Sequence, residues 1–132
     1  MKLKRIIYSK INAKAQEMFN FQKASAKLAD YGFTTMWLYN DWQGAHFIAI
    51  HVDGVIIIKV QLKGRLSFNR EYIGKDIFIC FRTDGEVYLY PHDLILEQIE
   101  HRIADRTWNT MGKWSSPRLT KENKRLLEPY LL

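Results

Sequence analysis

The stretch from Ala45 to Arg65, AHFIAIHVDGVIIIKVQLKGR, constrains the fold more than any other part of the sequence. Two segments rich in isoleucine and valine flank Asp53-Gly54, a dipeptide that favours a two-residue turn between antiparallel strands. The stretch therefore predicts a β-hairpin. With these two residues as the loop, the strand register places His46 opposite Gln61.

The two faces of this hairpin differ in polarity because side chains alternate along a strand. One face is almost entirely apolar and is expected to be core; it carries Phe47, Ala49, Val60 and Leu62. The other face becomes more polar with distance from the turn and ends in His46, Gln61 and Lys63. Cross-strand neighbours lie ~5 Å apart, so these three side chains can converge on one ligand or ion. They form a candidate site.

The composition sets bounds on size and partners. The chain has 132 residues, of which 47% are hydrophobic, so we expect one compact domain over residues 1–132 with a core of its own. Lysine and arginine number 20 against 14 acidic residues, a formal net charge of +6 that favours polyanionic partners.

Cysteine content and hydropathy exclude other classes of protein. The single cysteine, Cys80 in the segment IFICF, excludes an internal disulfide and a multi-cysteine zinc site, and we expect it to be buried. The basic N-terminal segment lacks the apolar core of a signal peptide. No run approaches the ~20 apolar residues of a membrane span. These features predict a cytoplasmic protein with no membrane partner.

The remaining segments predict an α/β (α+β) domain with a mixed central β-sheet flanked by helices. Apolar residues recur at helical spacing over residues 10–30, and Gly32 follows where a left-handed residue is expected. Strands are expected at 33–39, 77–81 and 87–90, and helices at 94–106 and 120–129. The segments 40–44, 65–75 and 107–118 are expected to be turns, loops or irregular structure.

A leading helix, a strand and a hairpin that ends in a polar residue-x-Lys pattern together resemble the PD-(D/E)XK nuclease superfamily. This superfamily includes restriction endonucleases, archaeal Holliday-junction resolvases and some homing endonucleases. The resemblance runs from about Lys10 to the helix after Asp93. It puts His46 where the family has its first metal-binding aspartate, Gln61 at the (D/E) position and Lys63 at the lysine.

The resemblance implies a restriction-endonuclease-like fold, Mg²⁺ dependence and hydrolysis of phosphodiester bonds. Lys63 would orient water or stabilise charge on the phosphate. The expected metal ligands are His46, Gln61 and Asp41, and Glu17 on the leading helix would complete the catalytic set. Two positions depart from the acidic motif. Mg²⁺ prefers oxygen ligands and negative charge, so a histidine nitrogen suits Mn²⁺ better.

Basic residues after the hairpin and near the C-terminus are candidate contacts for nucleic acid: Arg65, Arg70, Lys75, Lys113 and Arg118. A solvated basic loop is the simpler interpretation of any one of them. Trp108 and Trp114 lie among the C-terminal group; they suit packing against the sheet, or stacking on an unpaired base.

The sequence thus predicts a metal-dependent endonuclease acting on nucleic acid, with DNA as the expected substrate. One alternative is a catalytically inactive nucleic-acid-binding protein that keeps the nuclease fold. Another is an interaction protein whose charge is incidental. Many enzymes of this type act as dimers, so a homodimer is allowed, although nothing in the sequence identifies its interface.

Overall fold

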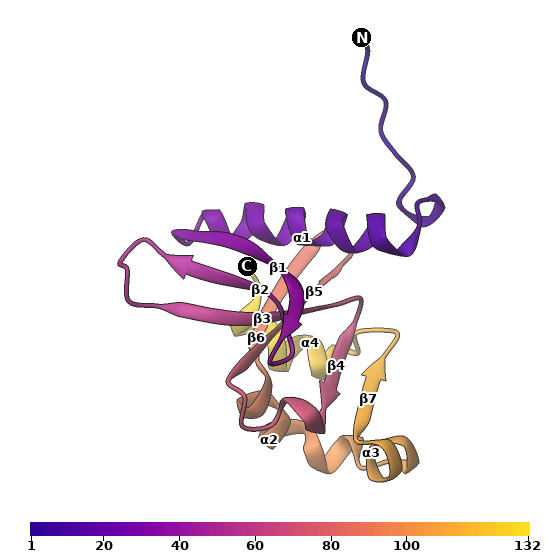
Figure 1. Ribbon diagram of the computed structural model, residues 1–132. Coiled ribbons are helices and arrows are strands. Elements are labelled where there is room, and N and C mark those ends of the chain that lie inside the picture. Colours follow the sequence, from indigo (N-terminus) through magenta and orange to yellow (C-terminus); the bar gives the residue numbers. More distant parts are fainter.

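The computed structural model describes residues 1–132 and shows a mixed sheet with helices on both of its faces (Figure 1). The helices are α1 (Ala13–Ala29), α2 (His92–Ile103), α3 (Arg106–Met111) and α4 (Lys121–Leu127). The strands are β1 (Phe33–Trp42), β2 (Ala45–His51), β3 (Ile57–Lys63), β4 (Leu66–Asn69), β5 (Ile77–Thr83), β6 (Glu86–Pro91) and β7 (Lys113–Ser116). The predicted mixed sheet flanked by helices is confirmed.

The central sheet has five strands in the order β1-β2-β3-β5-β6. Strands β3 and β5 run parallel, and the other neighbouring pairs run antiparallel. The connection between β3 and β5 contains β4 and a single 3₁₀ turn, Arg70–Tyr72. Since β3 and β5 are parallel, the carboxyl end of β3, which carries the candidate site, lies next to the carboxyl end of β5.

Helix α1 forms where the sequence predicts it. The Asn12 side chain accepts a hydrogen bond from the Ala15 backbone N–H at 2.8 Å, which caps the first turn. Beyond the last turn, Gly32 has φ of +84°, the left-handed conformation expected there. In Figure 1 the helix lies along one face of the sheet, and the segment before it runs away from the body.

Two hydrophobic clusters fix the sheet between its covering layers. The cluster under α1 contains Leu28, Phe47, Ala49, Val60 and Leu62, which confirms the predicted core face of the hairpin. The larger cluster on the other face joins the sheet to α2, α3 and α4 through residues such as Ile79, Tyr90, Ile95, Trp108 and Leu127. Cys80 is fully buried, as predicted, and burial raises the pKa of its thiol to about 12.

The hairpin register is as predicted, but the turn is wider. Ile48 pairs with Lys59 and Ile50 with Ile57. The strands separate after His51, and β3 begins only at Ile57, so the expected two-residue turn is wrong. The reason is the Asp53 carboxylate, which accepts hydrogen bonds from the backbone N–H groups of Val55 and Ile56 and holds an open loop.

Three segments expected to be irregular contain regular structure. Strand β1 continues through an irregular register to Trp42, beyond its predicted end at Tyr39. Residues 66–69 form β4, which pairs antiparallel with β7 in a separate two-stranded ribbon. Helix α3 precedes β7 and ends at Gly112, whose φ is +69°. The left-handed φ favours glycine at this position, and an added Cβ would also lie 3.1 Å from the Arg70 side chain.

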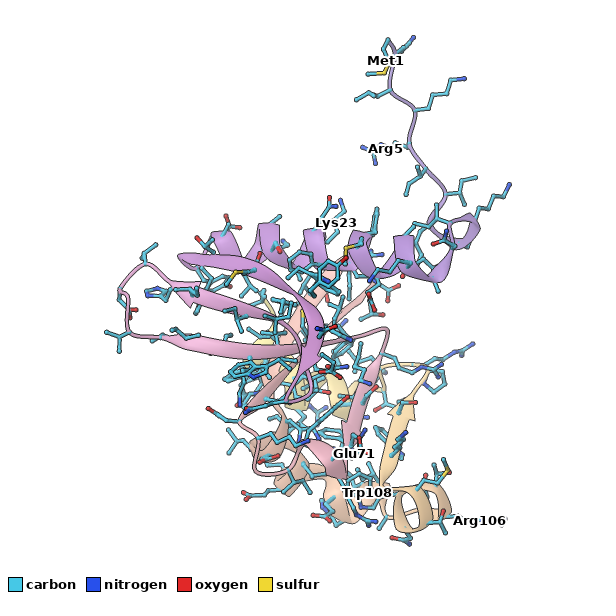
Figure 2. The ribbon with its side chains drawn as sticks, in the orientation of Figure 1. Met1, Arg5, Lys23, Glu71, Arg106 and Trp108 are labelled. Carbon is cyan, nitrogen blue, oxygen red and sulfur yellow. The ribbon has the colours of Figure 1, made fainter.

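Figure 2 shows the side chains of Met1 and Arg5 on the extended N-terminal segment, away from the sheet. The same view shows Trp108 on the side of α3 that faces the body, with Arg106 at its outer end. None of the helices combines the length and apolar character that a bilayer span requires.

Candidate functional site

The hairpin brings His46, Gln61 and Lys63 together at the carboxyl end of β3. The His46 Nε2 and Gln61 Nε2 atoms are 3.4 Å apart across the two strands. Gln61 is only 5% exposed, whereas Lys63 is half-buried. The Lys63 Nζ atom lies 5.6 Å from the centre of the Tyr72 ring, which supports the ammonium group from the protein side.

His46 is held in one protonation state and one orientation. The Leu62 backbone N–H donates a hydrogen bond to His46 Nδ1 at 3.0 Å, and the imidazole stacks on Trp37 with ring centres 5.6 Å apart. Burial lowers the pKa of His46, so the ring is neutral at pH 7. A neutral imidazole has one acceptor and one donor nitrogen. Because Nδ1 accepts, the proton of His46 resides on Nε2.

Gln61 is the unusual group of this site, because its Oε1 atom is buried without a hydrogen-bond partner. Its amide nitrogen faces the Nε2–H group of His46, and two donors cannot bond to each other. A half-turn of the amide would let Oε1 accept from His46, and would turn the amide N–H groups to the position that lacks a partner. A buried polar group of this kind calls for a partner from outside the chain.

The two carboxylates expected to support the site lie near it without joining it. Burial lowers the pKa of His46, and the negative charges of Glu17 and Asp41 partly oppose this effect. Both carboxylates are therefore close enough to interact electrostatically with the ring. Glu17 lines a hollow of about 180 Å³ between α1 and the end of β3, here called the Glu17 hollow, which Lys63 also lines. The carboxylate of Glu17 is paired with the Lys14 ammonium at 2.9 Å. Asp41 is exposed on β1 and forms no ion pair.

The residues present do not fit a resident Mg²⁺ or Mn²⁺ ion. No three histidine, cysteine, aspartate or glutamate side chains gather closely enough to hold a metal. His46, predicted as a ligand, has no free lone pair: Leu62 N–H occupies Nδ1, and Nε2 carries the proton. Gln61 offers at most a neutral oxygen, whereas Mg²⁺ requires several oxygen ligands and negative charge. The ligand set of His46, Gln61 and Asp41 stays a prediction, and the chemistry of His46 and Gln61 as they stand here does not favour it.

The predicted nucleic-acid contacts are all exposed, and none is in an ion pair. Lys113 lines a second hollow together with Lys63. Arg65 lines a small neighbouring hollow beside the segment that carries Arg118. The Arg70 guanidinium stacks on Trp108, 4.6 Å from the ring centre. Lys75 is connected to the site only through its backbone N–H, which donates to the Tyr72 carbonyl at 3.1 Å.

The sequence analysis missed several residues of this region. Trp37 stacks on His46, and Lys14 neutralises Glu17 and lies 5.1 Å from the centre of the Trp37 ring. Thr107 and Ser115 line the second hollow with Lys63. Helical spacing between Lys14 and Glu17 could have revealed their ion pair. No local signal could have brought residues 107–115 to Lys63, because that depends on the pairing of β4 with β7.

No protein-family model matches this chain, and no curated protein matches it either. Among solved structures, it is similar to a bacterial homing endonuclease, I-Ssp6803I, with a TM-score of 0.48 and 21% identity over 64% of this chain and 69% of that chain. It is also similar to Hjc, a Holliday junction resolvase from Archaeoglobus fulgidus, with a TM-score of 0.47 and 7% identity over 60% of this chain and 75% of that chain. Both are among the kinds of nuclease that the sequence resemblance names. Similarity at this level concerns the arrangement of elements and leaves the chemistry to the residues of this chain.

Proposed function

We propose that this chain is a nucleic-acid-binding protein with a nuclease-like fold, which binds the phosphodiester backbone of DNA at a site centred on Lys63. The observation that carries the proposal is the position of this ammonium group. It stands where the Glu17 hollow and the second hollow meet, and no carboxylate is paired with it. A lysine without an anionic partner, at the end of a strand and between two hollows, is suited to hold a phosphate group from outside.

The groups around Lys63 have the chemistry of a phosphate site more than that of a metal site. Once the Gln61 amide is turned, its oxygen accepts the His46 Nε2–H bond, which leaves the Gln61 amide N–H groups as the donors without a partner. The exposed cations Arg65, Lys113 and Arg118 add charge around these hollows. Donors and cations together suit phosphate oxygens, and each phosphate neutralised releases counterions.

A second candidate function is metal-dependent hydrolysis of phosphodiester bonds, the function that the sequence resemblance implies. It is favoured by the buried Gln61 oxygen without a partner and by the two nearby carboxylates, Glu17 and Asp41. In that case Lys63 would stabilise charge on the phosphate. This candidate ranks second because His46 would first have to release Leu62 N–H to free a lone pair.

Fluorescence anisotropy with a labelled duplex DNA, at several salt concentrations and with EDTA present, tests the first proposal. The logarithm of the binding constant should fall linearly with that of the salt concentration, and Lys63→Ala should reduce this slope by about one. Lys121→Ala, on the exposed first turn of α4, is the matched control and should leave the slope unchanged. Absent or salt-independent binding would show that the net charge is incidental and would contradict the proposal.

Nicking of a supercoiled plasmid in Mg²⁺ and in Mn²⁺ separates the two candidates. We expect the native protein to bind the plasmid without nicking it. Nicking that Lys63→Ala abolishes would place metal-dependent hydrolysis first. Nicking that persists in Lys63→Ala would indicate a contaminating nuclease.

A further inference from the structure

In the function proposed so far, the second hollow beside Lys63 contributes only cations at its edge, and its interior has no ligand. Its volume is about 270 Å³, and its walls come from the end of β3, from β4 and β7, and from α3. We call it the Trp114 hollow, because the half-buried indole of Trp114 is the aromatic side chain on its wall with exposed surface. Phe68, 1% exposed, packs behind it with ring centres 6.1 Å apart.

An aromatic wall of this kind suits a nucleobase. Bases stack on tryptophan with little dependence on their identity, because every base has a flat π-face. Trp114 is held on one side by Phe68 and by its place in β7, opposite Phe68 of β4. The indole is therefore positioned before any ligand arrives, and stacking on it would not require the side chain to become ordered.

The polar residues of the hollow supply what the rest of a nucleotide needs. Lys63 and Lys113 place two cations at its edge, and Thr107 and Ser115 add hydroxyl groups. Asn69 uses its Oδ1 atom to accept from the Glu71 backbone N–H, while its Nδ2 group forms no hydrogen bond. The hollow thus combines an aromatic surface, a free amide donor and two cations, the groups that bind a base and its phosphate.

We propose that the Trp114 hollow accepts one unpaired nucleotide of a nucleic acid whose backbone lies across Lys63. This inference rests on the proposed function, because it gives that site a substrate class. A base inside a duplex is stacked on both sides and cannot reach a wall of the protein. The protein should therefore prefer DNA with an unpaired nucleotide beside a duplex, such as a bulge, over fully paired DNA.

Three labelled oligonucleotides of matched length test the preference: a full duplex, the same duplex with one bulged nucleotide, and the single strand. Anisotropy in EDTA should show about tenfold tighter binding of the bulged duplex than of the full duplex, the factor expected from one base stacked on an aromatic side chain. Trp114→Leu should abolish the preference, and Trp114→Phe should retain most of it. Trp42→Leu, which removes another exposed tryptophan outside the hollow, is the control and should leave the preference unchanged.

A second readout reports on the base itself and does not depend on affinity. With 2-aminopurine at the bulged position, stacking on Trp114 should quench its fluorescence when the native protein binds. The quenching should persist with Trp42→Leu and disappear with Trp114→Leu, provided that the variant retains the native circular dichroism spectrum. Should Trp114→Leu fail to fold, Trp114→Phe at matched saturation provides the same test: its smaller ring should quench less than the indole, and unchanged quenching would overturn the role of Trp114.

The outcomes distinguish this inference from the function on which it rests. Equal binding of the three oligonucleotides without quenching would overturn the role of the Trp114 hollow and leave backbone binding at Lys63 standing. Absence of binding to all three would overturn both. Adenosine monophosphate provides a further arm: tight binding of the free nucleotide with no binding of the oligonucleotides would identify a small-molecule site and refute the substrate class proposed here.

Discussion

Replacing His46 with aspartate should give this protein a divalent-metal site that the native chain lacks. In the native chain, Leu62 N–H occupies one nitrogen of the His46 ring, and a proton occupies the other. An aspartate at this position can accept from Leu62 N–H with one oxygen and offer the other to a metal. The Gln61 oxygen without a partner and the charges of Glu17 and Asp41 would then support a Mn²⁺ ion.

The size of the effect follows from ligand linkage. Once free Mn²⁺ exceeds its dissociation constant, each tenfold rise in concentration adds about 1.4 kcal/mol to the free energy of unfolding. The entropy of unfolding of a 132-residue chain, taken at about 2.1 cal/mol/K per residue, is about 0.28 kcal/mol/K. The melting temperature of His46→Asp should therefore rise by about 5 °C for each tenfold increase in Mn²⁺.

Differential scanning fluorimetry over a Mn²⁺ series, with an EDTA reference for each protein, measures this shift. His46→Asn is the matched control, because it has the shape of aspartate without its charge and should show no shift. The native protein should show none either. A native shift as large as that of His46→Asp would refute the reasoning, since it would mean that the His46 ring binds metal despite its bond to Leu62 N–H.

Three further predictions concern stability and reactivity. Gln61→Met replaces a buried amide that has one atom without a hydrogen-bond partner. The free energy of unfolding, measured by urea denaturation, should therefore stay within about 1 kcal/mol of the native value or rise, while DNA affinity falls. A loss of stability above about 3 kcal/mol would mean that the amide is fully bonded. Burial lowers the pKa of both His46 and His92 below 6.5 in the folded protein, so as the pH falls these residues are protonated in the unfolded chain first. The free energy of unfolding should therefore be at its full value above about pH 6.5 and decline below it. His92→Gln should make this decline less steep. Stability that rose on acidification would contradict this assignment. Cys80, with its pKa raised to about 12, should not react with a thiol reagent such as DTNB until the protein is unfolded, and fast labelling of the native chain would show that this strand is accessible.

Local patterns in the sequence were sufficient for the central sheet. Alternation of apolar side chains fixes the register of β2 on β3, because a shift by one residue would turn Phe47 and Val60 away from α1. The same patterns identify α1, α2 and α4. They fail at the turn, where the preference of Asp53-Gly54 for a tight turn loses to the hydrogen bonds that the Asp53 carboxylate accepts.

Strands β4 and β7 could not be predicted, because each is four residues long and pairs with a partner distant in the sequence. Their apolar side chains are buried by tertiary contacts: Phe68 packs against Trp114 and also against Tyr90 and His92. The Trp114 hollow depends on this pairing, so it could not be predicted from the sequence. His92 illustrates the same limit: its place beside Asp93 indicates the start of a helix, which α2 confirms, but not that the ring is fully buried and accepts from the Asn69 backbone N–H at 3.1 Å.

The candidate site was predictable in its members and not in its chemistry. Alternation along two strands is enough to put His46, Gln61 and Lys63 side by side. Whether His46 binds a metal depends on a single backbone N–H, that of Leu62, and no sequence pattern reports the position of a proton. The Glu17 carboxylate is likewise near the site but paired with Lys14.

The β4–β7 ribbon also has a consequence for the order in which the protein forms and opens. Closing it requires residues 66–69 to find residues 113–116 across most of the second half of the chain, whereas the hairpin of β2 and β3 closes a short loop. A two-stranded ribbon is marginally stable without its packing partners, so it should form after the five-stranded sheet and open before it. Native-state hydrogen exchange should therefore be faster at amides of β4 and β7 than at those of β3 and β5. A ligand in the Trp114 hollow would contact both strands of the ribbon. It would therefore stabilise their pairing and slow hydrogen exchange there before it slowed exchange elsewhere.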